Sequence, residues 1–148
     1  MTPVPDLSGE WDQKKLRNWM ANAKRLGRSD IYQAAYRQLC RVEGRNIDDP
    51  LEADFSAVMR ALEEALSQEA GKTRRLSRTR QKLGRVGVRQ TLADLALKPS
   101  PSIGFLKLVA FGMADMSAEA LILKYRDEFD TAVVAAATER LSKHGIST

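Results

Sequence analysis

The sequence predicts an all-α protein, a compact bundle of about seven helices. Apolar residues recur every three or four positions along most of the 148-residue chain, which is the helical rather than the strand period. The composition, 43% hydrophobic and 29% charged, is typical of a globular domain with a core. We therefore expect a disordered N-terminal tail over residues 1–9 and one all-α domain over residues 10–148. The domain divides into an N-terminal part (10–71), a basic helix (72–89) and a C-terminal part (90–148).

Three helices are expected in the N-terminal part. The first two, at about residues 10–26 and 29–44, are separated by a glycine and predict an antiparallel hairpin. The third has the clearest start, because Asp49 can cap it and Pro50 takes the first helical position. We expect this third helix to end at about Gly71.

Further helices are expected after the basic segment. One must finish near Lys98, because the prolines that follow cannot continue it. Ser117 and Asp130 are placed to cap the last two helices.

Between these helices the run 103–113 is apolar almost all the way round. A helix of this kind is normally buried, so we expect residues 105–111 to lie at the centre of the C-terminal part. A short strand at about residues 104–109 is the alternative, since periodicity alone does not separate the two for so short an apolar run.

The net charge of +5 is concentrated in one segment. Residues 72–89 hold eight Lys or Arg and no Asp or Glu, whereas residues 1–71 hold ten basic and twelve acidic side chains and residues 90–148 hold six and seven. A focused cluster of this kind makes a local field that attracts a polyanion, most often nucleic acid.

As one helix, the basic segment would have a charged and an apolar face. A row of cations at intervals of three or four could follow a phosphate backbone, while Leu76, Leu83 and Val86 would hold the helix to the body. Gly84 and Gly87 weaken the helix interior and permit a kink or a loop. The predicted nucleic-acid-binding residues are Lys72, Arg74, Arg75, Arg78, Arg80, Lys82, Arg85 and Arg89.

These observations predict a non-enzymatic nucleic-acid-binding protein that contacts the phosphate backbone, with DNA expected in preference to RNA. One alternative is a helical adaptor or accessory subunit that docks on an acidic protein partner. Another is a solvated basic face that pairs with the acidic residues of the N-terminal part. Exposed apolar surface would favour the adaptor.

No catalytic, metal or cofactor site is predicted. The single histidine, His144, lies near the C-terminus, and the single cysteine, Cys40, falls among packed helical positions. A carboxylate cluster at residues 48–54 could serve a metal-dependent nuclease, but Asp49 and Glu52 are explained by helix capping and the helix dipole. The Gly-Lys-Thr at residues 71–73 lacks the preceding glycine and strand of a phosphate-binding loop.

A cytoplasmic location is expected. The N-terminal ten residues lack the basic start and apolar run of a signal peptide, and a lone cysteine forms no internal disulfide. The longest apolar stretch, residues 103–114, is shorter than the roughly 20 residues needed to cross a bilayer. No membrane anchor is therefore predicted.

Overall fold

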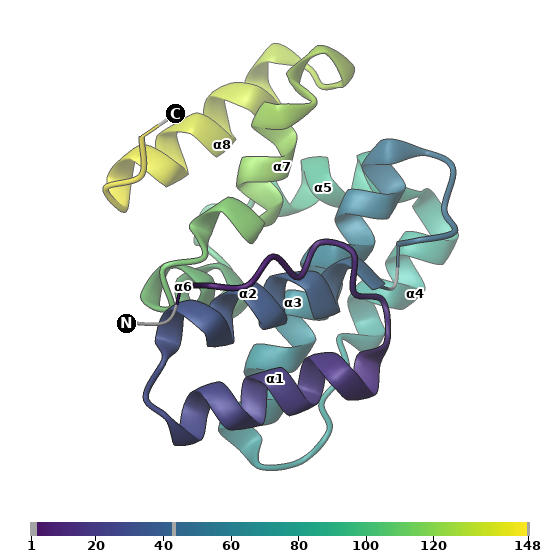
Figure 1. Ribbon diagram of the computed structural model, residues 1–148. Helices are drawn as coiled ribbons and strands as arrows, with labels where there is room; N and C mark the ends of the chain where they lie inside the picture. Colours follow the sequence, from purple (N-terminus) through teal and green to yellow (C-terminus); the bar gives the residue numbers. More distant parts are fainter. Residues whose placement is uncertain (1–2, 43, 148) are drawn as a thin grey trace.

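The computed structural model describes residues 3–42 and 44–147, and within these residues it is all-helical, with no strand (Figure 1). The predicted all-α class is confirmed. The described helices are α1 (Gln13–Arg25), α2 (Ser29–Val42), α3 (Pro50–Ala70), α4 (Ser77–Val86), α5 (Val88–Leu97), α6 (Ile103–Ala110), α7 (Ala118–Lys124) and α8 (Thr131–Lys143), with short 3₁₀ turns at Ala114–Met116 and Arg126–Glu128.

Helix α3 begins and ends where its capping residues predict, whereas α1 begins at Gln13 rather than at about residue 10. Asp12 caps α1, and α1 and α2 form the expected hairpin across Gly27, whose φ is +69°. The Asp49 side chain accepts a hydrogen bond from the Leu51 N–H at 3.1 Å, and Gly71 ends α3 in the left-handed conformation. These ends satisfy backbone groups that a helix cannot pair internally.

Two apolar clusters share the long central helix α3. The N-terminal cluster joins α1 and α2 to one side of α3 and includes Leu16, Leu39 and Ala61. The C-terminal cluster joins α3 to α5, α7 and α8 through residues such as Phe55 and Ile122. Because α3 contributes to both, it positions the N-terminal hairpin relative to the C-terminal helices (Figure 1).

The segment predicted as a disordered tail packs on the body where the structure describes it. Residues 3–9 carry no helix, but Leu7 is buried in the N-terminal cluster. The Gln38 amide nitrogen donates to the carbonyl oxygens of Ser8 at 3.2 Å and Glu10 at 2.9 Å. Residues 1 and 2 lie outside the described part of the chain.

The basic segment is not one helix, which corrects the prediction for residues 72–89. A non-helical loop runs from Gly71 to Leu76, α4 follows, and Gly87 separates α4 from α5. Gly87 has φ +87° and ψ 170°, a backbone conformation that is essentially restricted to glycine. Arg89 therefore lies on α5, whereas the other seven basic residues lie on the loop or on α4.

Helix α6 also differs from the prediction that residues 105–111 are central. The strand alternative is wrong, but only Phe105 and Leu108 of α6 are buried, whereas Ile103 is 70% exposed and Phe111 44% exposed. Gly104 lets α6 lie close to α3, since a Cβ there would collide with the Leu62 side chain. Helix α6 thus buries one face and leaves apolar side chains on the other.

Candidate nucleic-acid interface

The eight predicted cations separate into two groups in the structure. Three of them, Arg80, Lys82 and Arg89, form ion pairs with carboxylates elsewhere in the chain. The other five are exposed, and no carboxylate of the described residues forms an ion pair with any of them. We call these five the exposed cationic set: Lys72, Arg74, Arg75, Arg78 and Arg85.

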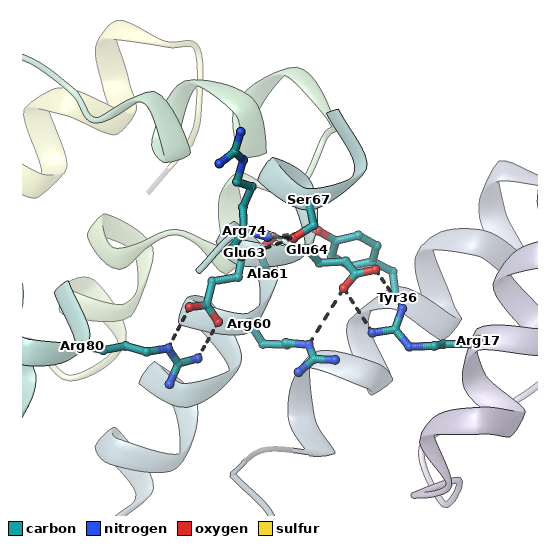
Figure 2. A network of polar contacts seen from close by, with 9 residues as sticks. All are labelled: Arg17, Tyr36, Arg60, Ala61, Glu63, Glu64, Ser67, Arg74 and Arg80. Carbon is teal, nitrogen blue, oxygen red and sulfur yellow. Dashed lines mark hydrogen bonds and ion pairs between the residues drawn. The ribbon is translucent and has the colours of Figure 1, made fainter. Parts of the chain in front are cut away.

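Arg80 is held by the buried Glu63 of α3. Its Nε donates to Glu63 Oε2 at 2.7 Å, and a second guanidinium nitrogen contacts the other carboxylate oxygen (Figure 2). The Glu63 side chain is 7% exposed. Burial would raise the pKa of Glu63, but the hydrogen bonds from Arg80 and from the Leu76 N–H outweigh burial and lower it. This ion pair fastens α4 to α3.

Lys82 and Arg89 form ion pairs that link α5 to neighbouring segments. Lys82 pairs with Asp94 of α5. Arg89 donates from Nε to Glu128 at 3.0 Å and from Nη1 to Asp49 at 3.3 Å, and the hydrogen bond with Glu128 contributes most to raising its pKa. Pairing with acidic residues of the N-terminal part, one of the sequence-based alternatives, therefore accounts for Arg80 and for one of the two ion pairs of Arg89. Lys82 and the other ion pair of Arg89 use carboxylates of the C-terminal part instead.

The loop before α4 is attached to α3 through its backbone. Ser67 Oγ accepts a hydrogen bond from the Arg74 N–H at 2.8 Å and donates one to the Arg74 carbonyl oxygen at 3.2 Å. Figure 2 shows the Arg74 guanidinium extending away from Glu63 and Glu64. The attachment thus fixes the loop and leaves the charged end of Arg74 free to reach a ligand.

A surface cavity of about 360 Å³ lies between α1, α3 and this loop. Its charged lining includes two arginines that the sequence analysis did not select, Arg17 and Arg60. Arg17 donates to both oxygens of Glu64 at 3.1 and 3.4 Å, and Arg60 Nε lies 4.0 Å from Glu64 (Figure 2). Because the cavity also reaches Arg74 and Arg75, it connects the exposed cationic set to α1.

The sequence contains a second basic run, in and around α1, that could have indicated the connection between the exposed cationic set and α1. Between Gln13 and Arg28 there are six basic residues and no acidic one, namely Lys14, Lys15, Arg17, Lys24, Arg25 and Arg28. This second run is weaker than the one at residues 72–89, and its connection to the loop depends on how α1 packs against α3. Only the tertiary structure shows that connection.

The residues weighed for catalysis have structural partners. Asp49 caps α3, and Asp54 accepts hydrogen bonds from the Lys124 amine and the Tyr125 hydroxyl, each at 2.7 Å. Cys40 is buried, and the His144 ring packs edge-on against Phe105 at 5.1 Å between centroids. Among residues 3–42 and 44–147 no group of three or more His, Cys, Asp or Glu side chains is placed to hold a metal ion.

Comparisons with models of known protein families, with curated protein sequences and with solved structures return no match. Within the part of the chain that the structure describes, no helix has the length and apolar character to cross a bilayer. The described residues form an all-helical fold in which the exposed cationic set lies on the loop before α4 and on α4 itself.

Proposed function

We propose that this protein binds nucleic acid, DNA in preference to RNA, through the phosphate backbone and without chemistry of its own. The observation that carries the proposal is the exposed cationic set, five like charges on one loop and one short helix. Like charges so close together repel, and among the described residues carboxylates form ion pairs with Arg80, Lys82 and Arg89 but with none of these five. A polyanion supplies the missing counter-charge.

The geometry suits a phosphate backbone. Arg78 and Arg85 are seven residues apart on α4, so they share one side of the helix at roughly 10 Å separation along its axis. Phosphates of one strand repeat about every 3.4 Å, so the two guanidinium groups can reach phosphates about three base pairs apart. Arginine also contacts phosphate with two parallel hydrogen bonds.

Binding would be driven by release of counterions from the nucleic acid. If all five side chains of the exposed cationic set contact B-DNA, the logarithm of the binding constant should fall with the logarithm of salt concentration with a slope near −4.5. Phosphate contacts carry little sequence information, so we expect modest sequence preference. The proposal places the protein in the cytoplasm, where a lone thiol such as Cys40 stays reduced.

A second candidate function is favoured by the apolar surface of α6. Ile103, Leu106 and Phe111 are each more than 40% exposed. Exposed apolar side chains on neighbouring positions are typical of protein-interaction surfaces. In this case the protein would be an adaptor whose basic loop and α4 dock on an acidic partner.

The test is fluorescence anisotropy of labelled duplex DNA and hairpin RNA, titrated with the protein over a salt series. We expect micromolar or tighter binding near physiological salt, lost in the Arg74→Glu/Arg78→Glu variant. The matched control, Arg126→Glu/Lys143→Glu, makes the same charge change on the C-terminal helices and should keep most of the affinity. Failure of both polymers to bind at low salt would refute nucleic-acid binding and leave the adaptor.

A further inference from the structure

A second cavity, which we call the apolar cavity, lies where α3, α4, α5, α6 and α7 meet. Its volume is about 300 Å³, and it is separate from the arginine-lined cavity beside α1. Its wall is made mostly of apolar side chains, including Leu62, Leu66, Leu76, Leu95, Ile103 and Phe105. A cavity of about 150 Å³ lined in this way can hold benzene, so this one has room for two rings or a chain of about ten carbons.

The few polar groups of the wall indicate which ligand would fit. The Glu119 carboxylate is already neutralised, because the buried Arg140 donates to it at 3.0 Å. The exposed Lys98, in contrast, forms no ion pair with any described residue, although its charge also acts on Asp94. The wall thus combines a long apolar surface with one lysine at its edge, which fits an apolar molecule that carries an acidic group.

The apolar cavity also shares part of its wall with the basic segment. Leu76 and Thr79, at the start of α4, contribute to it. The Leu76 N–H donates to Glu63 at 2.8 Å, so Leu76 joins the cavity to the ion pair that holds Arg80. A ligand that packs on Leu76 would restrain the junction between the loop and α4, from which Arg74 and Arg78 project.

We propose that the apolar cavity binds a small apolar carboxylate, of the size of a medium-chain fatty acid, and that the bound ligand orders the basic loop and the start of α4. Binding of the carboxylate does not depend on the proposed function. Its effect on the affinity for nucleic acid does rest on that function: a loop already ordered by the ligand would lose less conformational entropy when its cations bind phosphate.

Isothermal titration calorimetry with decanoate tests the site. We expect saturable binding at one site in the wild type and at least tenfold weaker binding in Leu66→Trp and in Ile103→Trp, which place a large ring in the cavity and at its exposed rim. Leu26→Trp is the control, since Leu26 is exposed and lies outside this wall. Lys98→Gln should weaken decanoate binding severalfold and leave decanol binding unchanged. Absence of saturable binding, or equal binding by all variants, would overturn the proposal.

Hydrogen exchange separates the ligand site from its effect on the basic segment. Saturating decanoate should slow amide exchange at residues 72–80 at least threefold, and should do so whether or not the protein binds DNA. If exchange at these residues is unchanged while decanoate binds, the ordering of the basic segment is refuted. If exchange slows and DNA still fails to bind at low salt, the proposed function fails and the ligand site stands.

Discussion

The backbone N–H of Leu76, the residue that precedes α4, donates to Glu63 Oε2 of α3 at 2.8 Å. Helix α4 has no side-chain cap of its own, because leucine cannot accept a hydrogen bond at that position. The buried carboxylate of Glu63 therefore supplies an acceptor from another helix. Because the same carboxylate binds Arg80, one side chain fixes both the start and the first turn of the basic helix.

Replacing this carboxylate should destabilise the protein. Glu63→Gln keeps the shape but removes the charge that accepts hydrogen bonds from Arg80 and Leu76, so we expect a loss of about 1–3 kcal/mol in the free energy of unfolding at pH 7. Urea denaturation followed by circular dichroism measures it. Glu69→Gln is the control: its pair with Lys107 is exposed, and the change should stay within about 0.5 kcal/mol. Equal effects of the two variants would contradict this role of Glu63.

The contribution of Glu63 should depend on pH. Its pKa is lower in the folded than in the unfolded protein, so folding favours the ionised form. The stabilisation is therefore complete above the unfolded pKa, about 4.3, and is lost as the pH falls through the lower folded pKa. The difference in unfolding free energy between wild type and Glu63→Gln should be largest above about pH 5 and shrink below pH 4. A difference that grows on acidification would contradict the assignment.

Replacing two glycines of the basic segment by alanine should change the free energy of unfolding in opposite directions. Gly87→Ala should cost about 1–3 kcal/mol, because φ +87° with ψ 170° is strained for any residue with a Cβ. Gly84→Ala should stabilise by about 0.5–1 kcal/mol, since Gly84 lies inside α4 and nothing is within 4 Å of the added Cβ. Urea denaturation of both variants checks this. If residues 72–89 formed one continuous helix, both changes would stabilise.

Local signals predicted most of the fold. Asp49, Pro50 and Gly71 fix both ends of α3, and Ser117 caps α7, because capping depends on residues a few positions apart. The break at Gly87 was only partly predictable. Glycine permits a positive φ without requiring it, and the choice depends on how α4 and α5 pack against α3.

The sequence predicted which cations belong to the candidate site, but not which of them form ion pairs within the protein. Charge counting found all eight cations of residues 72–89, yet it could not tell Arg80 from Arg78, because the difference is the buried Glu63 seventeen residues away. In the same way, the apolar pattern of α6 did not show that Ile103 would stay exposed. Both outcomes depend on contacts between helices that periodicity does not contain.

The buried ion pair between Arg140 and Glu119 should make a large contribution to stability when only one partner is removed. Arg140 donates to Glu119 and also to the carbonyl oxygens of Leu95, in the last turn of α5, and of Lys98, which follows α5. Arg140→Ala leaves a buried carboxylate unpaired and should cost about 3–5 kcal/mol, which lowers the melting temperature by roughly 10 °C. Differential scanning calorimetry measures the shift.

A double variant separates the two causes of that loss. Glu119→Leu/Arg140→Leu removes both charges and should recover part of the stability, because no charge is then left buried without a partner. Lys143→Ala breaks an exposed pair with Glu139 and should change stability by less than about 1 kcal/mol. A double variant less stable than Arg140→Ala would show that the pair contributes more than charge compensation.

Arg85 and Arg89 test whether pairing within the protein decides which cations reach nucleic acid. The two residues are four positions apart in sequence, but Arg85 belongs to the exposed cationic set and Arg89 is held by Glu128 and Asp49. Arg85→Ala should make the salt dependence of DNA binding less steep by about one unit, since one phosphate contact is lost, and should leave stability within about 0.5 kcal/mol. Arg89→Ala should leave the slope unchanged and cost up to about 1 kcal/mol of stability, because its ion pairs are partly exposed. Anisotropy titrations over a salt series measure the slope, and urea denaturation measures the stability. If both variants reduce the slope of the salt dependence equally, phosphates displace Glu128 and Asp49 from Arg89, and the interface extends from α4 onto α5.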